Sequence, residues 1–205
     1  LVVYIHGWNN CVMNVAGDTN TSCGGGAAAR QSSSLKTQLE ASNKNVLLIL
    51  PEVAYDQASS APGTLDDAGG FEALLAETLH HLAPELGIEY QPSDIETLVL
   101  MSHSGGYIAA AGIALLGGVP VDELHLLDSL YGETADFDAW VNDDLDSFVA
   151  LTRRFSTVYT LSGGTLANSQ SMANRAADWF DATPSVVVDD RTTSTWTAGS
   201  YAHGM

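Results

Sequence analysis

Short apolar runs alternate with helical patterns along the chain, and this alternation limits the possible folds more than any other feature. Each run has the length of a buried strand, and the runs cover residues 2–6, 45–50, 98–101, 124–127, 155–161 and 185–188. Apolar residues at helical spacing fill the stretches between them, over residues 27–42, 71–82, 108–116, 137–148 and 172–179. Strands separated by helices pair in parallel, with both faces of the sheet covered. The sequence therefore predicts an α/β fold with a mostly parallel sheet of about six strands and helices on both faces.

Length and hydrophobicity are those of one folded domain. The chain has 205 residues, of which 45% are hydrophobic, so we expect a single domain over residues 1–205 with a core of its own. No apolar run approaches the roughly 18 residues that a membrane span requires. The chain starts inside an apolar run at Leu1, which predicts that it is a piece of a longer precursor.

The charge balance narrows the classes of partner. Seven Lys and Arg face 25 Asp and Glu, giving a net charge of −18. Such a field repels phosphate backbones and anionic lipids, so we expect neither nucleic acid nor a membrane surface as partner. A surface poor in lysine suits an extracellular or salty setting, although an ordinary acidic protein has the same composition.

Cys11 and Cys23 flank a polar stretch, residues 12–22. Two cysteines around a loop favour a disulfide over a zinc site, which takes four ligands. Closing a loop of this size contributes about 3 kcal/mol to stability. The alternative is a pair of free thiols in a cytosolic protein. A disulfide predicts secretion to an extracellular or periplasmic space.

The third apolar run ends in the sequence MSHSGG at residues 101–106, and a helical pattern follows at once. Small residues let the backbones of strand and helix approach closely, and they lift Ser104, at the apex, above the sheet. The amides at the helix start favour negative charge there. The spacing Ser102-x-Ser104-x-Gly106 matches the nucleophile elbow G-x-S-x-G, with serine in the first small position. Here the chain resembles the α/β-hydrolase family of serine hydrolases over nearly its whole length.

Two other interpretations of these serines stay open. Ser104 alone is also a common type of residue at the N-cap of a helix. Ser102 is a second candidate nucleophile, although no glycine stands two residues after it.

The resemblance also implies an oxyanion hole. The family builds it in the loop after the strand that here covers residues 2–6, often after a His-Gly pair, which here is His6-Gly7. It implies that the backbone N–H of Trp8 is one donor and that of Gly105 the other. We expect His6 to be structural and to hold the loop by a side-chain hydrogen bond. The alternative for Trp8 is that its ring only forms part of the pocket wall or of the surface.

A serine hydroxyl needs a base, and the base needs an acid to orient it. The resemblance implies His203 as the base, in the loop after the last strand, where the family order Ser, acid, His is kept. The alternative is that His203 has no catalytic role and is only a histidine near a frayed terminus. Four other histidines are set aside because they lie on an earlier helix, next to the nucleophile or inside a strand: His80, His81, His103 and His125.

The acid does not stand at its usual family position, because residues 161–164 contain no carboxylate. Asp128 follows the run 124–127, and some lipases of this fold carry the acid at that place. Asp190 ranks second, and a helix-capping aspartate is the alternative for each.

No feature of the sequence predicts a metal or a cofactor. The acidic residues between 136 and 146 lack the glycine and terminal glutamate of a calcium loop and lie along a helical pattern, so we expect a solvated face. The glycine-rich stretches lack the Lys-Ser/Thr of a phosphate-binding loop. Glu52 is expected to line a pocket or anchor a loop.

The expected activity is hydrolysis of carboxylic esters through an acyl-enzyme, with a small-molecule or polymer-borne ester as substrate. Room for a large lid is lacking between residues 128 and 155, which argues against an interfacially activated lipase. The alternatives are a peptidase or amidase of the same fold and a catalytically inactive binding module. Aromatic residues expected to line the cleft are Tyr55, Tyr131, Trp196 and Tyr201.

Overall fold

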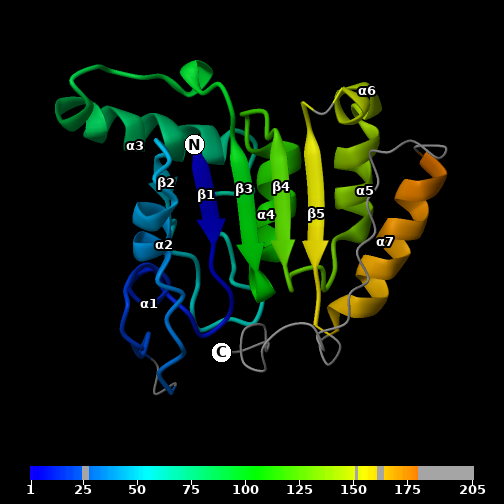
Figure 1. The fold of residues 1–205 in the computed structure, drawn as a ribbon, viewed down its shortest axis with the longest axis horizontal. Helices are drawn as coiled ribbons and strands as arrows, with labels where there is room; N and C mark the ends of the chain where they lie inside the picture. The colour runs from blue at the N-terminus through cyan, green and yellow to red at the C-terminus, as the bar shows by residue number, and fades with distance from the viewer. Residues whose placement is uncertain (25–27, 151, 161–163, 180–205) are drawn as a thin grey trace.

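A single parallel sheet organises the chain. The computed structural model describes residues 1–24, 28–150, 152–160 and 164–179. Its five strands lie in the order β2-β1-β3-β4-β5, and every neighbouring pair is parallel (Figure 1). The strands are β1 Val2–Ile5, β2 Leu48–Ile49, β3 Val99–His103, β4 Glu123–Leu127 and β5 Arg154–Val158. The predicted α/β fold is confirmed with five strands, and the sixth expected strand, at 185–188, lies outside the described residues.

Helices flank this sheet. The α-helices are α1 Val12–Ala16, α2 Leu35–Ser42, α3 Gly70–Leu86, α4 Tyr107–Leu116, α5 Thr134–Asn142, α6 Leu145–Val149 and α7 Thr165–Trp179. Two short 3-10 helices, η1 Pro92–Asp94 and η2 Ser104–Gly106, precede β3 and α4. Figure 1 shows α4 behind β3 and β4, α2 beside β2, and α7 beyond β5.

The core lies between one face of the sheet and the helices that cover it. Alternate strand residues point to this face, because successive side chains of a strand point to opposite sides. The fully buried apolar residues of the strands are Val3, Ile5, Leu100, Leu124 and Leu126, and those of the helices include Phe71, Leu75, Ile113, Phe137 and Trp140. Each such side chain contributes about 1.5–3 kcal/mol by leaving water.

The strand order fixes where the chain reverses its direction across the sheet. From β1 the chain moves to β2 on one side, and it then returns to place β3 on the other side of β1. The carboxyl ends of β1 and β3 are therefore neighbours from which the chain departs in opposite directions. In open α/β sheets, ligands bind at such a switch point.

Two helices differ from the sequence prediction. Residues 137–148 form two helices, α5 and α6, because the Asp144 side chain accepts from the backbone N–H of Ser147 at 3.1 Å and caps a new helix. The helix expected over 27–42 begins only at Leu35. The residues before it form loop contacts instead, such as the bond from the Ser32 N–H to Asn20 Oδ1 at 2.9 Å.

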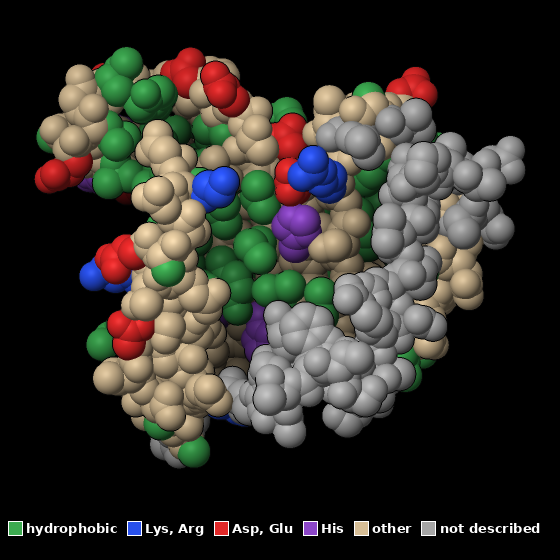
Figure 2. Space-filling model, viewed as in Figure 1, with side chains coloured by type: hydrophobic (Ala, Val, Ile, Leu, Met, Phe, Trp, Pro, Cys, Tyr) green, Lys and Arg blue, Asp and Glu red, His purple; other side chains and the backbone are tan. Residues whose placement is uncertain are grey.

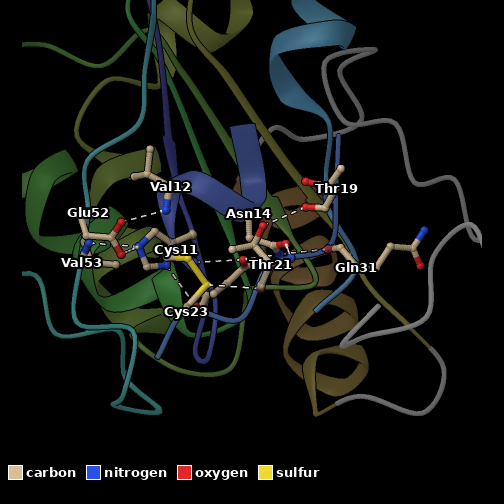
Figure 3. The surroundings of a disulfide bond; sticks show 12 residues. Cys11, Val12, Asn14, Thr19, Thr21, Cys23, Gln31, Glu52 and Val53 are labelled. Atoms are coloured by element: carbon tan, nitrogen blue, oxygen red, sulfur yellow. Dashed lines mark hydrogen bonds and ion pairs between the residues drawn. A yellow bond between two sulfur atoms is a disulfide. The ribbon is translucent and has the colours of Figure 1, made fainter. Parts of the chain in front are cut away.

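The predicted disulfide between Cys11 and Cys23 is confirmed (Figure 3). The buried Asn14 organises the loop that it closes. Its Nδ2 donates to Asn10 Oδ1 at 2.8 Å and to the Gln31 carbonyl at 3.2 Å, and its Oδ1 accepts from the Thr21 N–H at 2.8 Å. One side chain thus joins α1 to Thr21, inside the loop, and to Gln31, which follows it. Among the described residues, no helix is both long enough and apolar enough to cross a membrane.

Candidate functional site

Ser104 stands at a sharp turn from strand to helix. It follows β3 directly, and η2 and α4 continue from it without a loop. Its φ of 52° is left-handed, which few residues other than glycine adopt. A Cβ on Gly106 would lie 3.0 Å from the Ile5 carbonyl oxygen, so a side chain there would press the start of the helix away from β1. This is the strained turn that a nucleophile elbow requires.

Gly7 packs directly against Ser104. A Cβ on Gly7 would lie 2.6 Å from Ser104 Cβ and 3.2 Å from Ser104 Oγ. The contact arises at the switch point, because β1 and β3 pair in register with Ile5 opposite Ser102. The loop after β1 therefore contacts Ser104 through Gly7, a position that has no room for a side chain.

Trp8 lies in a turn whose neighbouring amides are already bonded. The Asn9 N–H donates to the Tyr55 carbonyl at 2.7 Å, and the Asn10 N–H donates to the Gly7 carbonyl at 3.2 Å. Within the described part of the chain, no group accepts a hydrogen bond from the Trp8 amide. Trp8 as a whole residue is 47% exposed, so it is not part of the core.

His6 holds this loop by its side chain, as the sequence predicted. The ring is buried, and its Nε2 accepts from the Val53 N–H at 3.1 Å while Nδ1 lies 3.1 Å from the Gly7 carbonyl oxygen. Glu52 Oε1 also lies 3.1 Å from Nε2, but Nε2 donates to it only when Nε2 carries a proton, and it then no longer accepts from the Val53 N–H. Glu52 Oε2 accepts from the Val12 N–H at 2.9 Å, so Glu52 anchors the start of α1 (Figure 3).

Gly105 is covered by the loop of residues 51–61, in which the sequence analysis considered only Glu52 and Tyr55. A Cβ on Gly105 would lie 2.3 Å from the Ala58 carbonyl oxygen and 3.0 Å from Ser60 Oγ. The Gly105 amide belongs to the first turn of a helix, where the N–H groups have no acceptor within the helix. No motif in the sequence marks Ala58 or Ser60, because their position depends on how this loop folds.

A buried chain of hydroxyls fixes the backbone of Ser104. Ser102 and Ser129 are fully buried, and their Oγ atoms lie 2.8 Å apart. Ser129 Oγ donates to the Ser104 carbonyl at 2.8 Å, so its own oxygen accepts from Ser102. Ser102 is thus occupied in the interior, while Ser104 is partly exposed. The sequence analysis missed Ser129, which carries no motif.

Asp128 lies at the carboxyl end of β4, next to Ser104. His103, the last residue of β3, pairs with Leu127, the last residue of β4. Ser104 and Asp128 are the residues that follow directly on these two neighbouring strands. The Asp128 side chain is 6% exposed and accepts from Thr160 N–H at 3.2 Å and Thr160 Oγ1 at 3.0 Å. Thr165 Oγ1 at the start of α7 also donates to it. These donors fix the orientation of the carboxylate.

Tyr131 lies close enough to this carboxylate to feel its charge, and its ring lies near that of Tyr107. The rings of Tyr107 and Tyr131 lie 6.2 Å apart at their centres. Burial, and to a smaller extent the negative charge of Asp128, together raise the pKa of Tyr131 to about 12. Asn168 Nδ2 donates to the Leu130 and Tyr131 carbonyls at 2.9 and 3.1 Å and holds this segment against α7.

A groove of about 630 Å³ runs along the other face of the sheet and ends near Asp128. Its lining includes Tyr4, Leu48, Met101, His103, Leu127 and Thr160. Figure 2 shows apolar side chains gathered in this hollow over the middle of the sheet. His103 thus faces the groove, on the opposite side of β3 from the buried Ser102, as expected from the alternation of side chains.

The remaining histidines are divided between described and undescribed parts of the chain. His80 and His81 are exposed on α3 and face Glu89 and Glu77. His125 in β4 bonds with Ser156 Oγ at 2.6 Å and Glu123 Oε2 at 3.2 Å. His203, the expected base, lies outside the described residues, as do Asp190, Trp196 and Tyr201. Nowhere in the described residues do three or more His, Cys, Asp or Glu side chains gather in a way that could hold a metal ion.

The structure thus brings four of the predicted features together at the carboxyl ends of β1, β3 and β4: the Gly7-Trp8 turn, Ser104, Gly105 and Asp128. Comparison with protein-family models, with curated proteins and with solved structures found no match to this chain.

Proposed function

We propose that the protein is a serine hydrolase of the α/β-hydrolase type that cleaves carboxylic esters through an acyl-enzyme. One observation carries the proposal: Ser104 occupies a left-handed strand-to-helix turn at the switch point of the sheet, with Gly7 in contact with its side chain. Such backbone strain costs about 1–3 kcal/mol and is found especially often at active sites.

The proposed reaction has two halves. Ser104 Oγ attacks the ester carbonyl carbon while His203 takes its proton, and the alcohol then leaves with that proton as the C–O bond breaks. Water attacks the acyl-enzyme in the second half, with His203 again accepting a proton. The carboxylic acid is released, and the proton returns to Ser104.

The Trp8 and Gly105 amides are the proposed donors to the oxyanion. Support comes from the Trp8 amide, which has no acceptor among the described residues, and from the place of Gly105 in the first helical turn. A donor of this kind is worth about 3–4 kcal/mol of transition-state stabilisation.

Asp128 is the proposed acid, with Asp190 as the second candidate. Asp128 is favoured by its place directly after β4, the strand next to β3, and by the three hydrogen bonds that its carboxylate accepts, because a triad acid must hold a fixed orientation toward the imidazole.

Esters are the proposed substrates because an alcohol is an easier leaving group than an amine, and both soluble and polymer-borne esters suit the site. The Cys11–Cys23 disulfide is consistent with an oxidising compartment, and we propose an extracellular or periplasmic location.

The test is turnover of p-nitrophenyl esters and of the matching p-nitroanilides by the purified chain and its variants. Ser104→Ala and His203→Ala should each lower kcat by about a thousandfold or more. Asp128→Asn should lower kcat far more than Asp190→Asn, which serves as its matched control. Turnover should fall as pH drops through the usual range of histidine, because a protonated base accepts no proton.

Each alternative gives a different result. Faster turnover of the anilides than of the esters indicates a peptidase or amidase. A folded protein that turns over neither substrate class, or one whose activity survives Ser104→Ala, contradicts the proposal and leaves a binding module of this fold.

A further inference from the structure

Ser102 occupies the first small position of the elbow, where the G-x-S-x-G pattern has glycine, and the proposed reaction gives its hydroxyl no use. The side chain is fully buried, and its Oγ lies 2.8 Å from the Oγ of Ser129, which is equally buried. Ser129 comes from the turn after β4, 27 residues later in the chain. Burying two hydroxyls costs free energy unless both are hydrogen-bonded, so the third group that they bind indicates what the pair does.

The two hydroxyls donate in one direction, toward Ser104. A carbonyl oxygen only accepts, so the proton of Ser129 Oγ is the one that bonds to the Ser104 carbonyl, at 2.8 Å. Ser129 Oγ then accepts from Ser102 Oγ. Bonds in such a chain strengthen one another in an interior of low dielectric constant. The pair therefore holds the Ser104 carbonyl oxygen toward the interior.

The held carbonyl fixes the amide on the other side of the same peptide group. None of the peptide bonds in the described residues is cis, so the planar group that joins Ser104 to Gly105 is trans, and its N–H points opposite to its C=O. The Gly105 N–H therefore points away from the buried hydroxyls. Gly105 is the second residue of η2, where an N–H has no acceptor within the helix.

The other proposed oxyanion amide is oriented in the same way. The Asn10 N–H donates to the Gly7 carbonyl at 3.2 Å, and Nδ1 of the buried His6 lies 3.1 Å from the same oxygen. The peptide between Gly7 and Trp8 is also trans, so the Trp8 N–H points away from these two groups. Each amide is thus aimed through the carbonyl of the residue before it.

We propose that the Ser102–Ser129 hydroxyl pair positions an oxyanion donor: by holding the Ser104 carbonyl, it aims the Gly105 N–H at the carbonyl oxygen of the substrate. This inference rests on the proposed function. Neither serine touches the substrate, and no bond forms or breaks at either one. A donor that is already aligned stabilises the charge of the transition state without reorganisation, so the pair should act on kcat and leave KM unchanged.

Ser129→Ala removes the donor to the Ser104 carbonyl. The kcat for a p-nitrophenyl ester should fall by about tenfold to a hundredfold with KM unchanged, which is less than the loss expected when an oxyanion donor is removed outright. Ser102→Ala leaves Ser129 bonded to that carbonyl and should lower kcat less. Ser169→Ala is the matched control, because Ser169 on α7 is also buried and its Oγ lies 2.9 Å from Thr157 Oγ1. It should lower the melting temperature and leave kcat unchanged.

An alkyl trifluoromethyl ketone probes the oxyanion site directly. Ser104 Oγ forms a bond to the ketone carbon, its proton goes to His203, and the π electron pair of the carbonyl becomes the oxyanion of a hemiketal. Fluorine NMR follows the protonation of that oxygen with pH. An aligned donor stabilises the oxyanion and lowers the pKa of the hemiketal, so Ser129→Ala should raise this pKa. A loss of stability alone, as in Ser169→Ala, should not change it.

Two further comparisons separate the hydroxyl from the packing of the site. Ser129→Thr keeps a hydroxyl and Ser129→Val has the same shape without one, so the threonine variant should have the higher kcat and the lower hemiketal pKa. The double variant Ser102→Ala with Ser129→Ala leaves no Ser102 proton without an acceptor. Its melting temperature should exceed that of Ser129→Ala, while its kcat stays low.

Two sets of results overturn the inference, and they are distinguishable. If the wild-type chain neither turns over esters nor forms the hemiketal, the proposed function fails and the inference fails with it. If the wild type does both but Ser129→Ala matches it in kcat and hemiketal pKa, or the threonine and valine variants behave alike, only the inference fails. Should Ser129→Ala not fold, Ser102→Ala and the comparison of threonine with valine decide by the same measurements.

Discussion

Single atoms decide the geometry of the candidate site. Gly7, Gly105 and Gly106 each lack a Cβ where one would collide with the backbone or with Ser104. The pattern around Ser104 reveals two of these glycines from the sequence. The role of Gly7 follows from the resemblance and from its contact with Ser104, because nothing local predicts which strand its loop will meet.

Gly7→Ala tests this contact. The added methyl group would lie 2.6 Å from Ser104 Cβ, so the turn must shift, which we expect to cost about 1–3 kcal/mol of stability and most of the esterase activity. Urea unfolding and ester kinetics measure the two effects. Gly63→Ala, where no atom lies within 4 Å but φ is 67°, is the control and should cost stability alone. Full activity in Gly7→Ala would show that the contact is irrelevant.

The ionisation of Tyr131 tests the position of Asp128. Its pKa is raised to about 12 by burial and by the Asp128 charge, so Asp128→Asn should lower that pKa toward the ordinary value of 10. Because the pKa is higher in the folded state, the associated stability is complete below pH 10 and is lost as pH rises toward 12. Ultraviolet titration of the phenols, with Tyr131→Phe to identify the signal, measures the shift. An unchanged pKa in Asp128→Asn would place the carboxylate elsewhere.

At the scale of helices and strands, the sequence predicts what depends on local pattern. The five described strands fall on apolar runs, because alternate residues of the central strands are buried in the core and apolar residues also line the groove on the other face. The break between α5 and α6 was missed, since Leu145 and Phe148 continue the apolar spacing and only the side chain of Asp144 interrupts the helix. Ser60, Ser129 and Thr160 were missed for another reason: their partners are distant in the sequence, and no spacing predicts them.

Asp144 provides a test of this break. Its pKa lies below the usual value, first because Ser147 Oγ donates to it and then because the Ser147 N–H does. The stabilisation of α6 is therefore present above pH 3.8 and lost as pH falls through the lowered pKa. In a side-chain carboxyl NMR titration, Ser147→Ala should raise this pKa toward the ordinary value. A pKa of Asp144 equal to that of exposed aspartates would contradict the cap.

At the scale of the whole molecule, the disulfide and the sheet hold together the loops that form the site. The Cys11–Cys23 bond closes a loop that begins three residues after Trp8. The fold class, the disulfide and the elbow were accessible from the sequence because each has a local signature. The meeting of three loops over Gly7, Ser60 and Gly105 required the structure, because it results from strand order and from long-range contacts.

Removing the disulfide should destabilise the molecule without abolishing the fold. The cysteines are 12 residues apart, so the double variant Cys11→Ser with Cys23→Ser should lose about 3 kcal/mol in urea unfolding. Wild-type protein treated with a reductant should show the same loss. If reduction leaves the unfolding curve unchanged, the loop is held by Asn14 and its partners alone.

The central claim is that the turn after β3 presents Ser104 as a nucleophile. Its most direct test is to treat the native chain with a fluorophosphonate and to locate the adduct by peptide mass spectrometry. The account predicts one adduct, on Ser104, that is absent from Ser104→Ala. An adduct on Ser102, or none on a correctly folded chain, would contradict it.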